Sequence, residues 1–118
     1  MDNISKGKFG EVKALNYLKN IGYKVLEINW ETKIGELDIV SEADGTIVFV
    51  EVKARASFKY GSPAEAVNYY KQRKLSMMAA QYIKMKRLIG RKARFDVIEI
   101  VGESINHIIN AFNSTISF

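Results

Sequence analysis

The sequence predicts a single α/β domain spanning residues 1–118, in which one β-sheet is covered by helices on both faces. Helix-like and strand-like segments follow one another along the chain in the order α-β-β-β-α-β, with a further short strand at the end. The strands expected at 46–54 and 94–101 are apolar on both sides, as strands are when helices cover both faces of their sheet. A chain of 118 residues has room for one substantial core and not for two.

The first element is expected to be a helix from about Ser5 to Ile21. Its apolar side chains recur at helical spacing, at Val12, Leu15, Leu18 and Ile21. Gly22 follows directly and is a suitable helix stop. The sequence therefore predicts an amphipathic helix with this stripe facing the core.

Three strands are expected next, at 23–30, 35–42 and 46–55. The second and third flank the short segment Ala43-Asp44-Gly45, which is typical of a hairpin connection. These two strands should therefore be antiparallel neighbours in the sheet.

A second helix is predicted from a capping box at Ser62, Pro63 and Glu65, which would supply the N-cap, the first helical residue and the capping carboxylate. Its expected buried stripe consists of Leu75, Met78, Ala79, Tyr82 and Ile89. Gly90 is the expected end of the helix. A strand at 94–101 and a shorter last strand at 105–112 complete the predicted order.

Acidic and basic side chains lie on both strands of the predicted hairpin. Side chains two residues apart on a strand share a face, so Glu51 and Lys53 point the same way, as do Glu36 and Asp38. Whether the two pairs share one face depends on how the strands are paired.

The register that places Glu42 opposite Ile47, across a loop at 43–46, brings these charges together. Asp38 then falls opposite Glu51, and Glu36 falls opposite Lys53. A pairing slipped by one residue would place the same charges among apolar side chains, which is costly for unpaired charge. The first register is therefore expected.

Two carboxylates that face each other across neighbouring strands repel each other and normally destabilise a sheet. A divalent cation would relieve the repulsion, and Mg²⁺ prefers one or two carboxylates together with water and a substrate phosphate. Lys53 beside such an ion can stabilise charge on a scissile phosphate or help to deprotonate an attacking water. The alternative is an ion-pair ladder, with Glu36 and Lys53 as partners, that only braces the hairpin.

Nine basic residues lie in the segment from Lys71 to Arg94, in a chain whose net charge is +5. No acidic residue lies between Glu65 and Asp96. A segment of one sign suits a polyanionic partner, although a solvated helix face has the same composition. The candidate nucleic-acid contacts are Lys71, Gln72, Arg73, Lys74, Lys84 and Arg87.

Several remaining residues are expected to be structural. His107 is the only histidine, which excludes a histidine-based triad or a multi-histidine metal site. Asp96 is expected to pair with a nearby base, and Glu65 to act in capping rather than catalysis. Tyr69 and Tyr70 could stack on bases, although core packing is the more frequent fate of such aromatic residues.

Composition also bears on where the protein works. Cysteine is absent, so neither a disulfide framework nor a thiolate metal site is expected. No apolar run approaches the roughly 20 residues that cross a bilayer, and the first residues lack the apolar block of a secretory signal. We therefore expect a cytoplasmic protein with no membrane partner.

The motif "GELDIV" followed by "FVEVKAR" resembles the acid-x(n)-acid-x-lysine core of the restriction-endonuclease-like, or PD-(D/E)xK, nuclease superfamily. More closely, the chain resembles the small bacterial family typified by YraN, which shares these two runs as well as "KGKFGEVKALNYL", "GSPAEAV" and "RFDVIEI". It is also similar to archaeal Holliday-junction resolvases, which have an early glutamate, a G-x-x-D element and E-x-K in the same order. The resemblance covers nearly the whole chain.

The resemblance implies a three-layer sandwich with a mixed central sheet, and it implies roles for particular residues. The metal ligands would be Asp38, Glu51 and Glu11, together with the backbone carbonyl of Val52. Lys53 would be the catalytic lysine, acting with Asp38 and Glu51. Glu36 has no firm role in the superfamily and is expected to support the ligands from behind.

The expected function is that of a Mg²⁺-dependent (or Mn²⁺-dependent) endonuclease that hydrolyses DNA phosphodiesters, with branched DNA as the substrate suggested by analogy. Two alternatives stay open. One is a nucleic-acid-binding module that retains the fold and does not cut. The other is a small interaction protein whose carboxylates only brace the hairpin. A homodimer would suit a junction substrate, but nothing in the sequence requires one.

Overall fold

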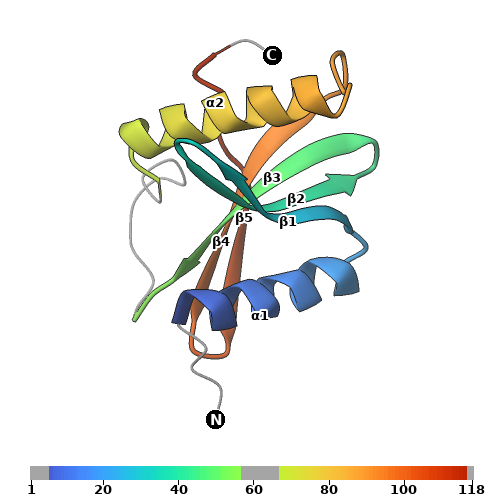
Figure 1. Ribbon diagram of the computed structural model, residues 1–118. Helices are drawn as coiled ribbons and strands as arrows, with labels where there is room; N and C mark the ends of the chain where they lie inside the picture. Colours follow the sequence, from blue (N-terminus) through green and yellow to red (C-terminus); the bar gives the residue numbers. More distant parts are fainter. Residues whose placement is uncertain (1–5, 57–66, 117–118) are drawn as a thin grey trace.

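The computed structural model describes residues 6–56 and 67–116, which form a five-stranded sheet between two helices (Figure 1). The elements are α1 (Lys6–Asn20), β1 (Lys24–Thr32), β2 (Gly35–Ala43), β3 (Thr46–Ala54), α2 (Tyr69–Met85), β4 (Ala93–Val101) and β5 (Ser104–Phe112). The helices lie on opposite faces of the sheet, so the molecule has three layers (Figure 1). The predicted fold class and element order are confirmed.

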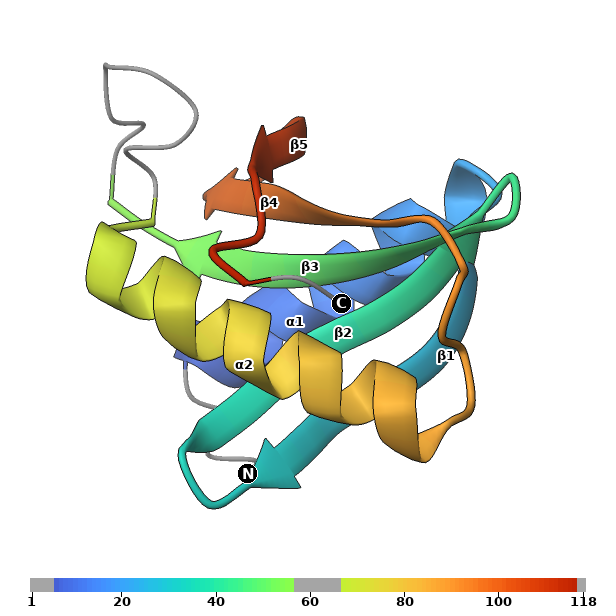
Figure 2. The same ribbon diagram turned by 90° about the horizontal axis from the view of Figure 1, so that it is seen from above.

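The sheet is mixed, and its spatial order β1-β2-β3-β4-β5 follows the chain. All neighbouring strands are antiparallel except β3 and β4, which are parallel. A parallel pair needs a crossover connection, and α2 lies in that connection. Viewed from above, α2 runs across the face of β2 and β3 while α1 lies behind the sheet (Figure 2).

The β2–β3 hairpin has the predicted register, with Glu42 opposite Ile47. The connecting loop is shorter than expected because residues 43 and 46 also pair, which leaves a two-residue turn at Asp44 and Gly45. Both turn residues have positive φ, 49° and 81°, as a type I′ hairpin turn requires. The pairing ends at Ile39 and Val50, so β2 and β3 separate just before Asp38 and Glu51.

Each face of the sheet carries its own core. The α2 face includes Leu37, Phe49, Leu75, Tyr82 and Phe95, all no more than 3% exposed. The α1 face is smaller, and its fully buried members include Ala14, Leu18, Ile39, Val48 and Ile98. Burial of apolar area on both faces is the main stabilising contribution in a fold of this kind.

The buried stripe of α1 differs from the predicted one. Val12 and Ile21 are 50% and 47% exposed, whereas Ala14 and Leu18 are fully buried. The helix approaches the sheet closely at Gly10, where an added Cβ would lie 3.3 Å from the Cβ of Ala54. Because this contact sets which side of the helix faces β3, the buried side carries Gly10, Ala14 and Leu18. Leu18 is therefore the one residue of the predicted stripe that is fully buried.

The second helix begins later than the capping box predicts. The N-cap of α2 is Asn68, whose side-chain oxygen accepts a hydrogen bond from the backbone N–H of Lys71 at 2.8 Å. Val67 and Asn68 are not helical, so no single helix runs on from the capping box. The box itself, at 62–65, lies outside the described residues.

The second helix also ends earlier than expected. It stops at Met85, with Lys86 as the C-cap and Arg87 at a φ of 58°. Ile89 therefore lies beyond the helix and is 71% exposed instead of buried.

The last strand, β5, has nine residues and is as long as the other strands, not shorter. Within the described part of the chain, no helix combines the length and the apolar character that crossing a membrane requires.

Candidate metal centre

The point at which β2 leaves β3 is marked by a bond between a side chain and the backbone. The carboxylate of Asp38 accepts a hydrogen bond from the backbone N–H of Val52, with Oδ2 and N 2.9 Å apart. This bond occurs just past the last regular pair of the two strands, Ile39 and Val50. The bond gives the Val52 N–H an acceptor that the separating strand no longer provides. It also fixes the Asp38 carboxylate at the opening between the strands.

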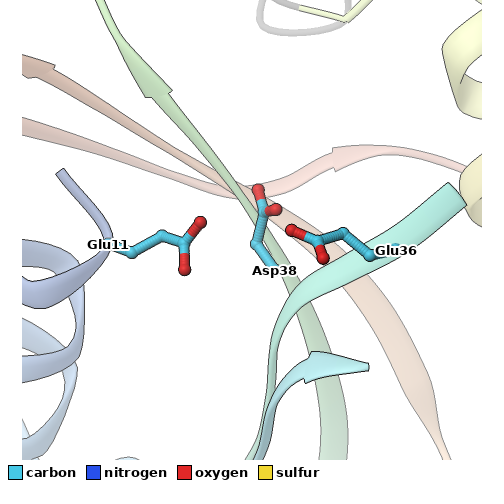
Figure 3. A group of neighbouring side chains, drawn as sticks. All are labelled: Glu11, Glu36 and Asp38. Atoms are coloured by element: carbon cyan, nitrogen blue, oxygen red, sulfur yellow. The ribbon is translucent and has the colours of Figure 1, made fainter. Parts of the chain in front are cut away.

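Two further carboxylates converge on Asp38. Glu11 comes from α1 and Glu36 from β2, and one oxygen of each of the three groups lies within 4.8 Å of the others. Figure 3 shows the Glu11 and Glu36 carboxyl groups approaching Asp38 from opposite sides. All three side chains are half-buried. Like charges held this close repel each other, and oxygen donors in such a group suit a hard divalent cation.

Burial and repulsion change how these groups hold protons. Burial, followed by the negative charge of Glu51, raises the pKa of Asp38 from 3.8 to about 7, against the opposing effects of the Val52 N–H and of Lys71. The pKa of Glu11 is also raised, first by burial and then by the charge of Asp38. Ionising these carboxyl groups is therefore unfavourable unless positive charge is brought among them.

Glu51 lies next to Asp38, on the α2 side of the sheet, and is 6% exposed. Its Oε2 lies 3.6 Å from the Lys53 ammonium and 3.5 Å from the Lys71 ammonium. Its Oε1 is buried and has no hydrogen-bond partner within residues 6–56 and 67–116. A buried oxygen without a partner is costly, and a cation would satisfy it. The residues present therefore fit an oxygen-ligated Mg²⁺ or Mn²⁺.

Most of the candidate site residues meet at this opening. Asp38, Val52 and Glu51 are joined through the contacts described above, and Glu11 reaches them from α1. Lys53 pairs with Glu51 on its own strand. Glu36 clusters with Asp38 and Glu11, and the ion pairs of the described residues include none between Glu36 and Lys53. The alternative arrangement, an ion-pair ladder of Glu36 and Lys53, does not form because the strands separate first.

The four candidate nucleic-acid contacts at the start of α2 differ in where their side chains lie. Lys71 turns toward the sheet and pairs with Glu51. Gln72 donates its amide Nε2–H to the backbone carbonyl of Val67 at 2.8 Å. Arg73 is exposed and Lys74 is partly exposed. Of these four candidates for nucleic-acid contact, Arg73 is the one that is fully exposed.

The other two basic candidates lie elsewhere. Lys84 is in the last turn of α2 and Arg87 lies just beyond it, and both are exposed. At about 1.5 Å of rise per residue, more than 10 Å of helix separates Lys84 from Lys74. The six candidates therefore divide between the two ends of α2, and only the first end adjoins the acidic cluster.

Asn29 belongs to the site and was missed by the reading of the sequence. It lies in β1 between Ile28 and Trp30, the partners of Ile39 and Leu37, which places it across from Asp38. Its side chain hydrogen-bonds Glu11 and lowers the pKa of that carboxyl, opposing the larger effect of burial. Its φ is 49°, and its buried Oδ1 has no hydrogen-bond partner in the part of the chain that the structure describes. The available signal was an asparagine inside a strand, a residue that is rare in strands and tolerant of positive φ.

A second polar cluster lies on the α1 face of the sheet, where its hydrogen bonds connect elements of the fold. Asp96 is fully buried and bonds Arg94 Nε at 3.0 Å, His107 Nε2 at 2.7 Å and the backbone N–H of Asn110 at 3.0 Å. The Nδ1 of His107 lies 3.1 Å from the Tyr17 hydroxyl. The cluster links β4, β5 and α1. Burial alone would raise the pKa of Asp96, but the hydrogen bonds from His107, Arg94 and Asn110 hold it below its usual 3.8.

Comparison with known proteins places the sequence among close relatives. The profile of a family described as "Uncharacterised protein family UPF0102" matches residues 10–100. A UPF0102 protein of Persephonella marina is 46% identical over 108 residues, which cover 92% of this chain and 93% of the relative. A UPF0102 protein of Clostridioides difficile is 46% identical over 114 residues, covering 95% and 100%. One from a Sulfurihydrogenibium species is 47% identical over 113 residues, covering 96% and 98%.

Proposed function

Because the chain belongs to the UPF0102 family, and because that membership carries no reaction with it, we propose a function from the site itself: a Mg²⁺-dependent or Mn²⁺-dependent nuclease that hydrolyses DNA phosphodiesters. One observation carries the proposal. The carboxylates of Glu11, Glu36, Asp38 and Glu51 gather where β2 leaves β3, with a lysine beside them and a buried oxygen without a partner.

The ion would be held by carboxylates from three elements. Asp38 and Glu51 would supply oxygens from β2 and β3, Glu11 would supply one from α1, and the backbone carbonyl of Val52 would complete the set. Glu36 lies close enough to contribute a further oxygen. When bound, the ion would supply Lewis acidity toward a phosphate oxygen and a hydroxide-like nucleophile near neutral pH.

The remaining roles fall to the lysine and the basic helix. The Lys53 side chain is 30% exposed beside Glu51, where its ammonium can approach a phosphate from solvent and stabilise charge that develops on it. Arg73 and Lys74, near the start of α2, can hold the nucleic-acid backbone without reading its sequence. Branched DNA remains the substrate suggested by likeness to the archaeal resolvases.

One observation favours a second candidate, a nucleic-acid-binding module that does not cut. The Lys71 ammonium already lies 3.5 Å from Glu51, where it neutralises part of the charge that a cation would otherwise balance. If that ion pair persists in solution, Glu51 is less available as a ligand. The two candidates differ in whether a divalent cation binds and in whether DNA is cut.

Isothermal titration with Mg²⁺ and Mn²⁺ tests the metal site. Wild type should bind a divalent cation, and Asp38→Ala should lose that binding. Glu103→Ala is the matched control because Glu103 is a highly exposed carboxylate in the β4–β5 turn, and its ion-pair partner among the described residues is Lys13. Failure of wild type to bind either ion would overturn the metal-dependent proposal.

Incubation with labelled DNA tests the reaction. Linear duplex, single-stranded and four-way DNA are each incubated with either ion and with wild type, Asp38→Ala or Lys53→Met. Wild type should cut at least one substrate, and Lys53→Met should lower the rate by about 100-fold while still binding the ion. Binding without cleavage on every substrate would establish the non-cutting module instead.

A further inference from the structure

A surface pocket of about 580 Å³ lies between the N-terminal half of α2 and the β1–β2 turn. It is lined by Ile34, Tyr70, Arg73, Lys74 and Met77. None of these side chains belongs to the acidic cluster. Figure 1 shows the turn between β1 and β2 lying against α2.

The pocket adjoins the candidate metal centre through Gly35. This residue begins β2 and directly precedes Glu36 of the acidic cluster. A Cβ added to Gly35 would lie 3.6 Å from Met78 Sδ and 3.8 Å from Lys74 Cε, so the stem of Lys74 passes close to the start of β2. A strand with a phosphate at the acidic cluster would therefore reach the pocket with its neighbouring nucleotides.

The lining combines exposed apolar surface with positive charge. Tyr70 is 72% exposed, Met77 45% and Ile34 39%. The Lys74 ammonium lies 5.7 Å from the centre of the Tyr70 ring. Arg73 adds a second cation, and the first turn of α2 has no acidic residue. An aromatic face with adjacent cations is the combination that holds a nucleobase together with its phosphate.

We propose that this pocket holds an unpaired nucleotide, with its base against Tyr70, Ile34 and Met77 and its phosphate toward Arg73 and Lys74. The proposal rests on the nuclease function proposed above and specifies its substrate class. A base inside a duplex is stacked and paired, so only a single-stranded, gapped or branched DNA offers a free base without the cost of extruding it. The preferred substrates would therefore contain unpaired nucleotides next to the cut.

A second copy of the chain is the other candidate occupant. The positive charges in the lining disfavour it, because the pocket contains two cations and no acid and the chain as a whole carries a net charge of +5. Two like-charged surfaces repel each other, whereas a polyanion is attracted to this one.

The test uses DNA that contains 2-aminopurine, whose fluorescence changes when the base leaves its stack, in buffer with EDTA so that neither metal nor cleavage contributes. The base is placed in a single strand, in a gap and in an intact duplex. Wild type should bind the first two more tightly than the duplex and should change their fluorescence. Equal affinity for all three would overturn the proposal.

Variants of adjacent tyrosines give the test its specificity. Tyr70→Leu should weaken binding to the single strand by about tenfold and abolish the fluorescence change, and Tyr70→Phe should retain both. Tyr69→Leu is the matched control because Tyr69 is 64% exposed but does not line the pocket. Equal losses for Tyr69→Leu and Tyr70→Leu would show that the pocket is not the site.

Two further measurements separate the possible failures. If wild type cuts DNA and Tyr70→Leu cuts and binds the same substrates equally well, the pocket proposal fails while the nuclease function stands. Sedimentation equilibrium without DNA should show no association that depends on Tyr70. A wild-type dimer that Tyr70→Leu dissociates would overturn the proposal in favour of a second copy.

Discussion

The carboxylate of Asp38 accepts a hydrogen bond from the backbone N–H of Val52, at 2.9 Å, just where the β2–β3 ladder ends. A side chain thus replaces the backbone carbonyl of a partner strand. The bond holds an acidic group inside the opening between two strands, where Glu11 and Glu36 also gather. The same geometry that builds the candidate metal centre therefore forces carboxylates together, and this has consequences for stability.

Asp38→Asn should stabilise the metal-free protein at alkaline pH. The pKa of Asp38 is raised from 3.8 to about 7, so its contribution to stability is fully present below pH 3.8 and is lost as pH rises through 7. Asparagine keeps an oxygen acceptor for the Val52 N–H but carries no charge. We expect the free energy of unfolding in EDTA to rise by at least about 1 kcal/mol at pH 8, and by less at pH 5.

Thermal melts at the two pH values measure this difference, and Mg²⁺ supplies the second half of the test. Added Mg²⁺ should raise the melting temperature of wild type through binding to the folded state, and it should leave Asp38→Asn unchanged. Equal stability of the two proteins at both pH values would show that the Asp38 carboxyl is not in an unfavourable environment.

Asn29→Gly should weaken metal binding without unfolding the protein. Glycine adopts the φ of 49° at this position readily, so the free energy of unfolding should change by less than about 1 kcal/mol. Glu11 loses a hydrogen bond that lowers its pKa, and loss of such a supporting bond typically costs about 10-fold or more in metal affinity. Calorimetric titration with Mn²⁺ measures the effect.

Asp44→Gly is the control for the backbone at position 29. Asp44 also has a φ of 49° but lies exposed in the β2–β3 turn, away from the acidic cluster. Its replacement should leave Mn²⁺ affinity unchanged. If Asn29→Gly and Asp44→Gly bind Mn²⁺ equally well, Asn29 does not position Glu11.

Asp96 should make the fold sensitive to acid. Its pKa lies below 3.8, so its contribution to stability is present above that pH and is lost as pH falls through the lower, folded-state value. Asp96→Asn leaves Arg94 partly buried without its carboxylate and should cost about 3 kcal/mol at pH 7. The difference between the two proteins should shrink below pH 4.

Urea unfolding at pH 7 and pH 3 provides the comparison. Glu103→Gln removes a highly exposed carboxylate on the neighbouring turn and should change stability by no more than about 0.5 kcal/mol at either pH. An Asp96→Asn protein as stable as wild type at pH 7 would mean that the buried cluster is not a structural link between β4, β5 and α1.

The hairpin register was predictable because the cost of the slipped alternative depends only on residues close to one another in the sequence. Pairing Glu42 with Ile47 directs Asp38 toward Glu51, whereas a slip by one residue would set these charges among apolar side chains, and the structure has the Glu42–Ile47 register. The fold class followed from the same alternation, read along each strand. Such patterns depend only on residues close in sequence.

Which residues make up the site depends on contacts between segments that are distant in the sequence, and the periodicity of the sequence does not encode these contacts. The β2–β3 pairing ends at Ile39 and Val50, where the Asp38 carboxylate bonds the Val52 N–H instead, and Glu36 joins Glu11 and not Lys53. Asn29 enters through β1, a strand that the sequence pattern did not connect with the site. The early end of α2, where Arg87 adopts a φ of 58° and Ile89 is left exposed, was likewise not predicted from the apolar spacing.

Two glycine substitutions should separate backbone strain from steric contact. Gly35 has a φ of 150°, in a region that is essentially restricted to glycine, although a Cβ there would make only ordinary contacts at 3.6–3.8 Å. Gly10, within α1, has helical backbone but would bring its Cβ to 3.3 Å from Ala54. Gly35→Ala should therefore cost about 1–3 kcal/mol in the free energy of unfolding.

Gly10→Ala should be close to neutral, because the tight contact is offset by about 1 kcal/mol of gained helix propensity. Gly35→Ala should also lower Mn²⁺ affinity, since any shift of the backbone at position 35 moves Glu36 directly. Urea unfolding and calorimetric titration of both variants measure the two effects. A Gly35→Ala protein that keeps wild-type stability and metal affinity would show that the start of β2 is not held in the conformation on which the acidic cluster depends.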